Sequence, residues 1–218
     1  MGKNKEIREK VWGRRDYISF FLFSVLVGGA FKESLKIVND LINKTSFSLS
    51  FAYLVTNWAN PMLYSVIIFR FYIGNFLYLK WLSENKKSEI LWSISFLIML
   101  FQFTILMLMG LSIGSDLISK QKFFWLLFIL LSSDLLWILF LYILKQISAK
   151  EDNHAAIPKM WFTLNSIGFL FLLISFLIFK ENSYSKDSNL FFLVIFFLGL
   201  SFIDLHHDFF RLIRKTME

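Results

Sequence analysis

Long blocks of apolar residues, separated by short charged segments, constrain this 218-residue chain more than any other feature of its sequence. Several blocks reach the roughly 20 residues that a helix needs to cross about 30 Å of hydrocarbon. Charged residues make up 18% of the chain, against about a quarter in an average soluble domain. The pattern predicts an all-α fold, a polytopic integral membrane protein with about six transmembrane helices in a bundle.

The chain divides into a basic cytoplasmic head at residues 1–16 and a single transmembrane helical domain at residues 17–215. Residues 45–58 are apolar but too short to cross a bilayer, so we expect an interfacial or re-entrant segment there. Asn60 and Pro61 then predict a helix start, because proline at the first helical position gives up no needed N–H. The expected spans cover residues 15–38, 61–82, 90–113, 122–145, 160–179 and 189–213.

The first span follows the basic head directly, an arrangement that resembles a secretory signal. Residues 27–30 make a poor cleavage site, so a retained helix is the preferred interpretation. Lys32 and Glu33 near its outer end would be costly against lipid. We therefore expect this end of the helix to be amphipathic and packed against protein.

The distribution of basic residues predicts the orientation of the chain, because cytoplasmic loops carry an excess of Lys and Arg. With both termini inside (N-in/C-in), 15 of the 23 Lys and Arg residues are cytoplasmic, seven are outside and Arg70 lies within a span. Most of the tryptophans fall near expected helix ends, where their rings prefer the headgroup level. The expected location is the cell membrane, and the Lys-, Asn-, Ile- and Phe-rich composition favours a bacterial plasma membrane.

Three polar residues lie near the middle of expected spans, where an ionisable side chain is costly and tends to face protein. They are Arg70 in the second span, Gln102 in the third and Asp134 in the fourth. One hypothesis is an Arg70–Asp134 pair, with Gln102 in the same network, that lines a polar path or gate. The alternative is a buried pair that only holds the helices in register.

Helical spacing extends this intramembrane polar network along one face of the second span. That face carries Arg70, Asn75, Tyr64, Tyr78 and Gly74, and we expect it to face protein or water. Small residues let helices approach closely, so we also expect helix packing at Gly74 and at the G-x-x-x-G pair. The members of that pair are Gly110 and Gly114.

The sixth span carries an inner charged stripe. Its members are Asp204, His207, Asp208, Arg211 and Lys215. One interpretation is the amphipathic cytoplasmic end of a helix, in which Asp208 pairs with Arg211. The other is an inner vestibule that attracts or filters ions, with Asp204 as its deepest member.

Several classes of function have no support in the sequence. The chain contains no cysteine, no Walker A motif, no G-x-G-x-x-G and no H-E-x-x-H, so we expect no cofactor, no metal site and no catalytic residues. The basic residues lie between apolar blocks rather than on one domain, which argues against nucleic acid as a partner.

The sequence therefore favours an ion- or small-solute-permeation subunit, of the channel or transporter kind, whose intramembrane charges line or gate a polar path. The alternative is a membrane-embedded sensor, effector or accessory subunit of the stress or defence type, which acts through a partner protein. An intramembrane enzyme ranks third, because no nucleophile, base and acid occur together. The expected partners are the lipid bilayer and either further copies of the chain or another membrane or cytoplasmic protein.

Overall fold

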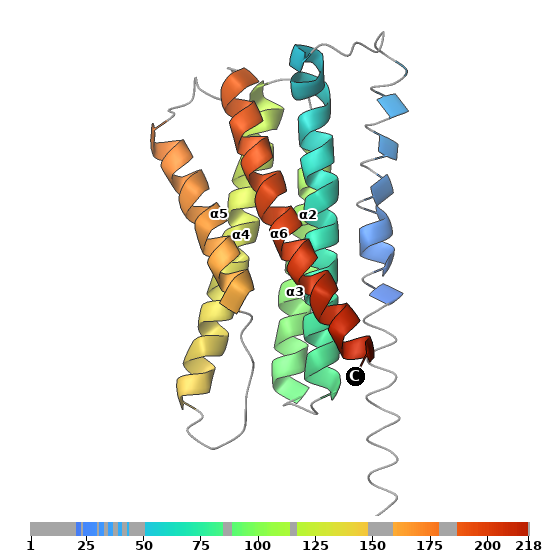
Figure 1. Cartoon of the computed structure of the whole chain (residues 1–218), viewed down its shortest axis with the longest axis vertical. Coiled ribbons are helices and arrows are strands. Elements are labelled where there is room, and N and C mark those ends of the chain that lie inside the picture. The colour runs from blue at the N-terminus through green and yellow to red at the C-terminus, as the bar shows by residue number, and fades with distance from the viewer. Residues whose placement is uncertain are drawn as a thin grey trace, which may run out of the picture.

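The computed structural model describes residues 51–84, 89–113, 117–147, 159–178 and 187–217, together with scattered helical positions between 21 and 43. In these ranges the regular elements are all helices: α2 (Phe51–Glu84), α3 (Glu89–Leu111), α4 (Leu117–Ile147), α5 (Lys159–Ile178) and α6 (Asp187–Met217). Consecutive helices run in opposite directions, so α2, α4 and α6 all end at the same end of the bundle (Figure 1). We call it the inner end, after the cytoplasmic side predicted from the basic residues.

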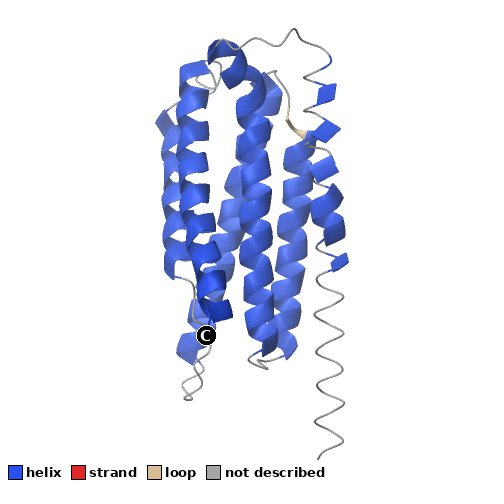
Figure 2. Ribbon diagram, turned by 45° about the vertical axis from the view of Figure 1, so that its right-hand side comes forward, coloured by secondary structure: helices blue, strands red, loops and turns tan. Residues whose placement is uncertain are grey.

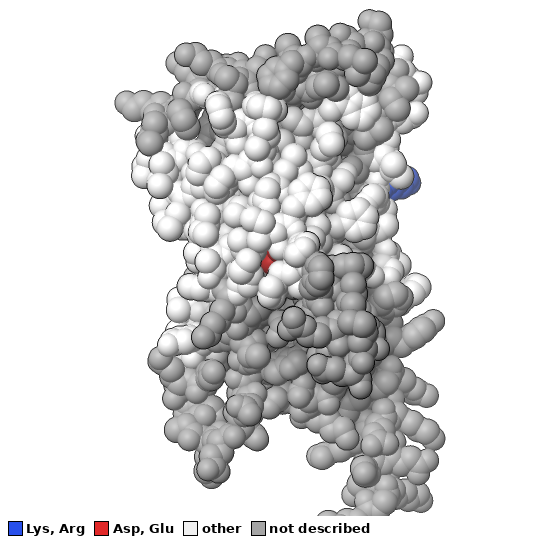
Figure 3. Space-filling view, in the orientation of Figure 1, with Lys and Arg blue, Asp and Glu red and all other residues white. Residues whose placement is uncertain are grey.

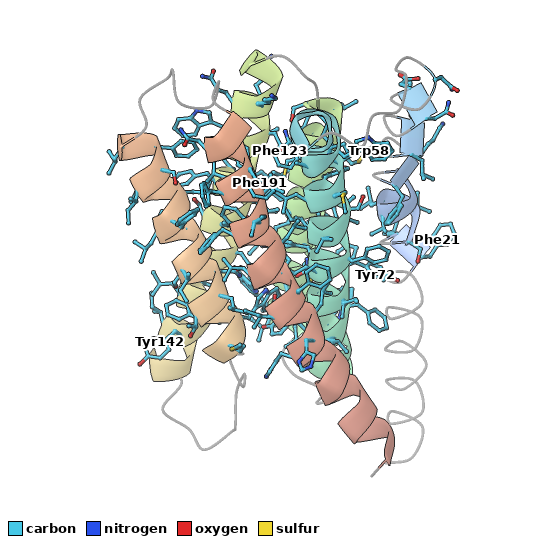
Figure 4. All side chains as sticks on the ribbon, turned by 45° about the horizontal axis from the view of Figure 1, so that its top comes forward. Phe21, Trp58, Tyr72, Phe123, Tyr142 and Phe191 are labelled. Atoms are coloured by element: carbon cyan, nitrogen blue, oxygen red, sulfur yellow. The ribbon has the colours of Figure 1, made fainter. Side chains whose placement is uncertain are left out.

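The five helices close into a ring. α2 packs against α3, α3 against α4, α4 against α5, α5 against α6, and α6 returns to α2. The helices stand side by side in a second view of the molecule as well (Figure 2). Side chains fill the interior of this ring, among them Phe123 of α4 (Figure 4).

In the part of the chain that the structure describes, four helices are long and apolar enough to cross a membrane. The stretches are Ala59–Leu79, Ile90–Leu111, Lys120–Ile143 and Met160–Leu177. The prediction of an all-helical, membrane-compatible bundle is confirmed to this extent. The apolar part of α6, Phe191–His207, is shorter than these four stretches. Its run of apolar residues is broken near the inner end by Asp204, His206 and His207.

The expected helix start at Pro61 is wrong. α2 begins at Phe51 and continues through Pro61, so residues 51–58 form its first turns. The apolar stretch long enough to cross a membrane begins after them, at Ala59, and an interfacial position for these turns stays a prediction. Proline inside a helix removes one backbone hydrogen bond, and the burial of Ala59 and Leu63 beside it favours the continuous helix. Residues 45–50 lie outside the described part of the chain.

The helical positions between 21 and 43 lie beside α2 (Figure 1). The rings of Phe31 and Phe69 meet edge to face, with centroids 5.0 Å apart. Lys32, the next residue, is exposed. The expected protein contact at the outer end of this helix is therefore made by Phe31, and Lys32 does not take part in it. Glu33 is not among the described residues.

Candidate functional site: a buried polar network

Six polar side chains meet inside the ring of helices and form a continuous chain of hydrogen bonds. We call this set the buried network, and each member is at most 2% exposed. Its members are Arg70 and Asn75 of α2, Gln102 of α3, Asp134 of α4, Asn165 of α5 and Asp204 of α6. Every helix of the ring thus contributes at least one residue.

The buried network contains one ion pair. The Nε of Arg70 donates to Oδ2 of Asp204 at 2.6 Å, and both side chains are almost completely buried. The Nη2 of Arg70 donates to Oδ1 of Asn165. Charge-assisted hydrogen bonds of this kind are roughly twice as strong as neutral ones, so Arg70 ties α2 firmly to both α5 and α6.

Asp134 is surrounded by amides. Its Oδ1 accepts from Nε2 of Gln102 at 3.0 Å, and its Oδ2 accepts from Nδ2 of Asn165. Gln102 in turn accepts at Oε1 from Nδ2 of Asn75, at 3.1 Å. Both carboxylate oxygens of Asp134 are therefore hydrogen-bonded, and in both cases the donor is neutral.

The expected direct contact between Arg70 and Asp134 is replaced in the structure by a bridge. Asn165 accepts from Arg70 and donates to Asp134, while Arg70 itself pairs with Asp204. α2 packs directly against α6, and this packing brings Asp204 within 2.6 Å of Arg70. The residue from the neighbouring helix therefore takes the ion pair.

The other members of the predicted polar network have different neighbours. Tyr64 is buried outside the network, and its hydroxyl donates to the backbone oxygen of Leu106 at 2.9 Å. Tyr78 is buried on the face of α2 that also carries Gly74. The structure thus places the whole expected polar face of α2 against protein, with two of its residues in the buried network.

The inner charged stripe is divided by the structure. Asp204 is 2% exposed and belongs to the buried network, so it does not line an open vestibule. His207, three residues further on, is exposed. The side chains of Asp208, Arg211 and Lys215 lie outside the described part of the chain.

Two glycines bring helices close together. A Cβ at Gly110 would lie 2.5 Å from the hydroxyl oxygen of Tyr64, so α2 and α3 depend on this glycine for their approach. A Cβ at Gly168 of α5 would lie 3.1 Å from the ring of Phe197 of α6, a contact that the sequence did not suggest. Gly114 lies outside the described residues.

Sequence reasoning missed Asn165, which connects the two halves of the buried network. The signal was present, because Asn165 is the one amide side chain of α5, a helix whose other polar residues are a lysine at its start and three small hydroxyl residues. Ser201 was also missed; it is fully buried three residues before Asp204, and its hydroxyl has no hydrogen-bond partner in the described part of the chain. Nearer the outer end, Asn60 and Lys120 are buried as well.

Apolar layers enclose the buried network on both sides. Towards the outer end lie Tyr64 and Phe123, whose rings meet edge to face at 6.4 Å, and Leu106. Towards the inner end lie Leu82 and Trp92, with the buried Tyr78 and Ser95 between them and the network along α2 and α3. The polar groups therefore bond to one another in a region enclosed by packed hydrophobic side chains, where each bond is stronger than it would be in water.

Comparison of the chain with protein-family models, with curated proteins and with solved structures finds no match. The class of the protein is therefore defined by its fold and site alone. It is a bundle of long apolar helices, compatible with a membrane, that encloses a charged and hydrogen-bonded network.

Proposed function

We propose that this chain is an integral membrane protein that acts as a permeation subunit for ions or small solutes, with the buried network as its closed gate. The surface of the described bundle supports the membrane setting, since one face is almost entirely uncharged (Figure 3). Large apolar side chains such as Leu97, Leu136 and Leu177 are more than 60% exposed. Exposed apolar surface on this scale marks contact with lipid or with another apolar surface.

Hydroxyl groups on the helices support the same setting. Thr104 lies on an exposed face of α3, and its hydroxyl donates to the backbone oxygen of Leu100. Ser65, Ser132 and Ser175 bond in the same way to a carbonyl four residues earlier. Polar groups in a bilayer must be satisfied within the protein, and these bonds meet that need without water.

The observation that carries the proposal is the composition of the buried network. Hydrogen bonds alone can hold helices together, and neutral amides form them with a smaller desolvation penalty than buried charges do. Here two carboxylates and a guanidinium are held at the centre of the ring. Intramembrane charges of this kind commonly mark ion pathways and proton relays.

A gate at this place would open by separation of helices. Each bond of the buried network joins two helices. Four of the five join neighbours in the ring, and the bond from Arg70 to Asn165 crosses the ring from α2 to α5. Movement of one helix outward would break its bonds and expose charged and amide groups to entering water. The polar path would then run between the helix whose bonds are broken and its neighbours.

The alternative function is a membrane-embedded sensor, effector or accessory subunit that acts through a partner protein. Closure of the network favours it, because six side chains that are at most 2% exposed serve well as a permanent lock. In that case the exposed apolar faces would bind a partner or a second copy. The cytoplasmic position of both termini and the cell-membrane location remain predictions under either function.

Flux through liposomes that contain the purified protein tests the proposal. We expect wild-type protein to conduct ions or small solutes, and Asp134→Asn and Arg70→Gln to change the flux by about tenfold or more, an effect of about 1.4 kcal/mol on the barrier. Ser132→Ala, a partly buried hydroxyl on the same helix as Asp134, is the matched control and should leave flux unchanged. Wild-type liposomes that stay silent, with a second protein that co-purifies from the native membrane, would favour the accessory function.

A further inference from the structure

The charges of the buried network do not balance. Arg70 contributes one positive charge, and Asp134 and Asp204 contribute one negative charge each when ionised. Arg70 and Asp204 are in direct contact at 2.6 Å and neutralise each other. Among the described residues, Asp134 is hydrogen-bonded only to the amides of Gln102 and Asn165. When it is ionised, its negative charge therefore has no cation in direct contact.

We propose that Asp134 is a proton-binding site, and that Gln102 and Asn75 accommodate its proton by reversing their side-chain amides. The inference deepens the proposed function, because it names the proton as an ion that the gate takes up. It rests on that function only for transport, since proton binding is measured without any flux.

The hydrogen bonds explain why one oxygen of Asp134 is suited to a proton. In the structure Asn75 donates to Gln102, and Gln102 donates to Oδ1 of Asp134. An amide carries donors and an acceptor at its two ends, so a half-turn exchanges them. After both amides turn, a proton on Oδ1 donates to Oε1 of Gln102, and Nε2 of Gln102 donates to Oδ1 of Asn75. One proton has entered, and the number of hydrogen bonds is unchanged.

The other oxygen is less suited to a proton. Oδ2 of Asp134 accepts from Asn165, whose own oxygen accepts from Arg70. If Asn165 turned to accept a proton from Oδ2, its amino group would face the guanidinium, and two donors would meet. The bond between Arg70 and α5 would be lost. The proton therefore belongs on the side of Gln102 and Asn75, where the chain of bonds ends in an amide that can turn.

The groups that face Asp134 determine the direction of the expected effects. Gln102 of α3 and Asn165 of α5 are neutral, Arg70 of α2 lies one amide away, and Asp204 of α6 lies on the far side of Arg70. Replacement of Asp204 by Asn would leave Arg70 with Asp134 as its nearest counter-charge. The ionised form of Asp134 would then be favoured, and its proton would be lost at lower pH.

Infrared difference spectroscopy of the full chain in lipid nanodiscs tests the inference, because a protonated carboxyl has a carbonyl stretch separate from the carboxylate bands. Spectra would be recorded from about pH 5 to about pH 9, a range in which an ordinary Asp is ionised throughout. We expect a protonated-carboxyl band that disappears in Asp134→Asn, changes frequency in Asp134→Glu, and is unchanged in Ser132→Ala. In Asp204→Asn the band should vanish at a pH at least about one unit lower, a tenfold loss of proton affinity.

Isotope-labelled glutamine tests the amide reversal. The carbonyl of Gln102 should change its frequency between acid and alkaline pH in wild-type protein, and this signal should be lost in Gln102→Met and in Asp134→Asn. A band that survives in Asp134→Asn, or no protonated carboxyl at any pH in this range, would overturn the proton site. A proton on Asp134 in a protein without flux would contradict the proposed function and leave the proton site standing.

Discussion

At the scale of single residues, the structure depends on contacts that leave no space for one additional methyl group. The hydroxyl of Tyr64 reaches the backbone of α3 beside Gly110, and any side chain at Gly110 would occupy the place of that hydroxyl. Among the described residues, no atom outside the local backbone of α6 lies within 4 Å of the position that a Cβ at Gly199 would take. The two glycines therefore make a matched pair for the same substitution.

We expect Gly110→Ala to lower the free energy of unfolding by about 1–3 kcal/mol, the usual cost of overpacking. Gly199→Ala should be neutral or should stabilise the helix by up to about 1 kcal/mol, because alanine is the better helix former. The measurement is reversible unfolding in mixed detergent micelles. Combination of Gly110→Ala with Tyr64→Phe should cost less than the sum of the two single changes, and strict additivity would show that the hydroxyl is not the atom displaced.

The ion pair makes a second prediction at this scale. Arg70→Met and Asp204→Leu each leave one buried charge without its partner, and each should cost about 3–5 kcal/mol of stability. The double variant Arg70→Met/Asp204→Leu should recover most of the loss, because no unpaired charge remains in that pair. The free energies of unfolding of the three variants and the wild type form a double-mutant cycle.

The control for this cycle combines Arg70→Met with Asp134→Leu. This variant still leaves Asp204 buried without a cation, so it should show little recovery. If both double variants recovered the same free energy of unfolding, Arg70 would interact equally with the two aspartates. That result would contradict the 2.6 Å contact between Arg70 and Asp204.

At the scale of elements, α3 shows how a nearly uniform apolar helix acquires two faces. Its exposed positions are Ile90, Ser93, Leu97, Phe101, Thr104, Leu108 and Leu111, at steps of three, four, four, three, four and three. Met99, Gln102, Phe103 and Leu106 between them are buried. Both faces are mainly apolar, and each carries two polar residues: Ser95 and Gln102 are buried, and Ser93 and Thr104 are exposed. The exposed stripe therefore follows from the positions of α2 and α4 rather than from the residue types.

Spin labels attached to single cysteines test this stripe, and the absence of native cysteine makes each label unique. In lipid bilayers we expect labels at positions 97, 101 and 108 to collide frequently with dissolved oxygen, which concentrates in hydrocarbon. Labels at positions 99 and 103 should be shielded by neighbouring helices. Oxygen accessibility that does not vary with the helical period would contradict the packing of α3 between α2 and α4.

At the scale of the whole molecule, the ring of helices and the alternating directions of its members place the ends of α2, α4 and α6 together (Figure 1). The basic residues predict that this end faces the cytoplasm, with the amino-terminal head on the same side. Orientation of the bundle is thus a property of the loops and termini, whereas its assembly is a property of the helices.

Labelling from either side of sealed membrane vesicles tests the orientation. Cysteines introduced at Lys3 and Lys215 should react with an impermeant maleimide from the cytoplasmic side, and a cysteine at Lys44 should react from the outside. Each variant should be counted only if it is expressed at the wild-type level. Labels on Lys3 and Lys215 that appear on opposite sides would contradict the prediction that both termini are cytoplasmic.

Much of this architecture could be predicted from the pattern of residues along the chain. The apolar blocks indicated the helices, because each must satisfy its own backbone in an apolar setting. The polar face of α2 could be assigned from helical spacing, since Arg70 and Asn75 share an arc with Tyr64. The extension of α2 to Phe51 could not, because Pro61 is a start signal in one context and an interior residue in another.

The sequence by itself determined that Arg70, Gln102 and Asp134 had to be sheltered, since a polar side chain in the middle of a membrane span is costly against lipid. It placed Asp204 on the inner charged stripe. Only the tertiary structure decided which groups shelter which. Because α6 is a neighbour of α2 in the ring, Arg70 forms its ion pair with Asp204. Asn165 connects Arg70 to Asp134 by hydrogen bonds. Hydrogen bonds require donor–acceptor distances near 3 Å. Between helices such distances are set by tertiary packing, which cannot be read from the spacing of residues along the chain.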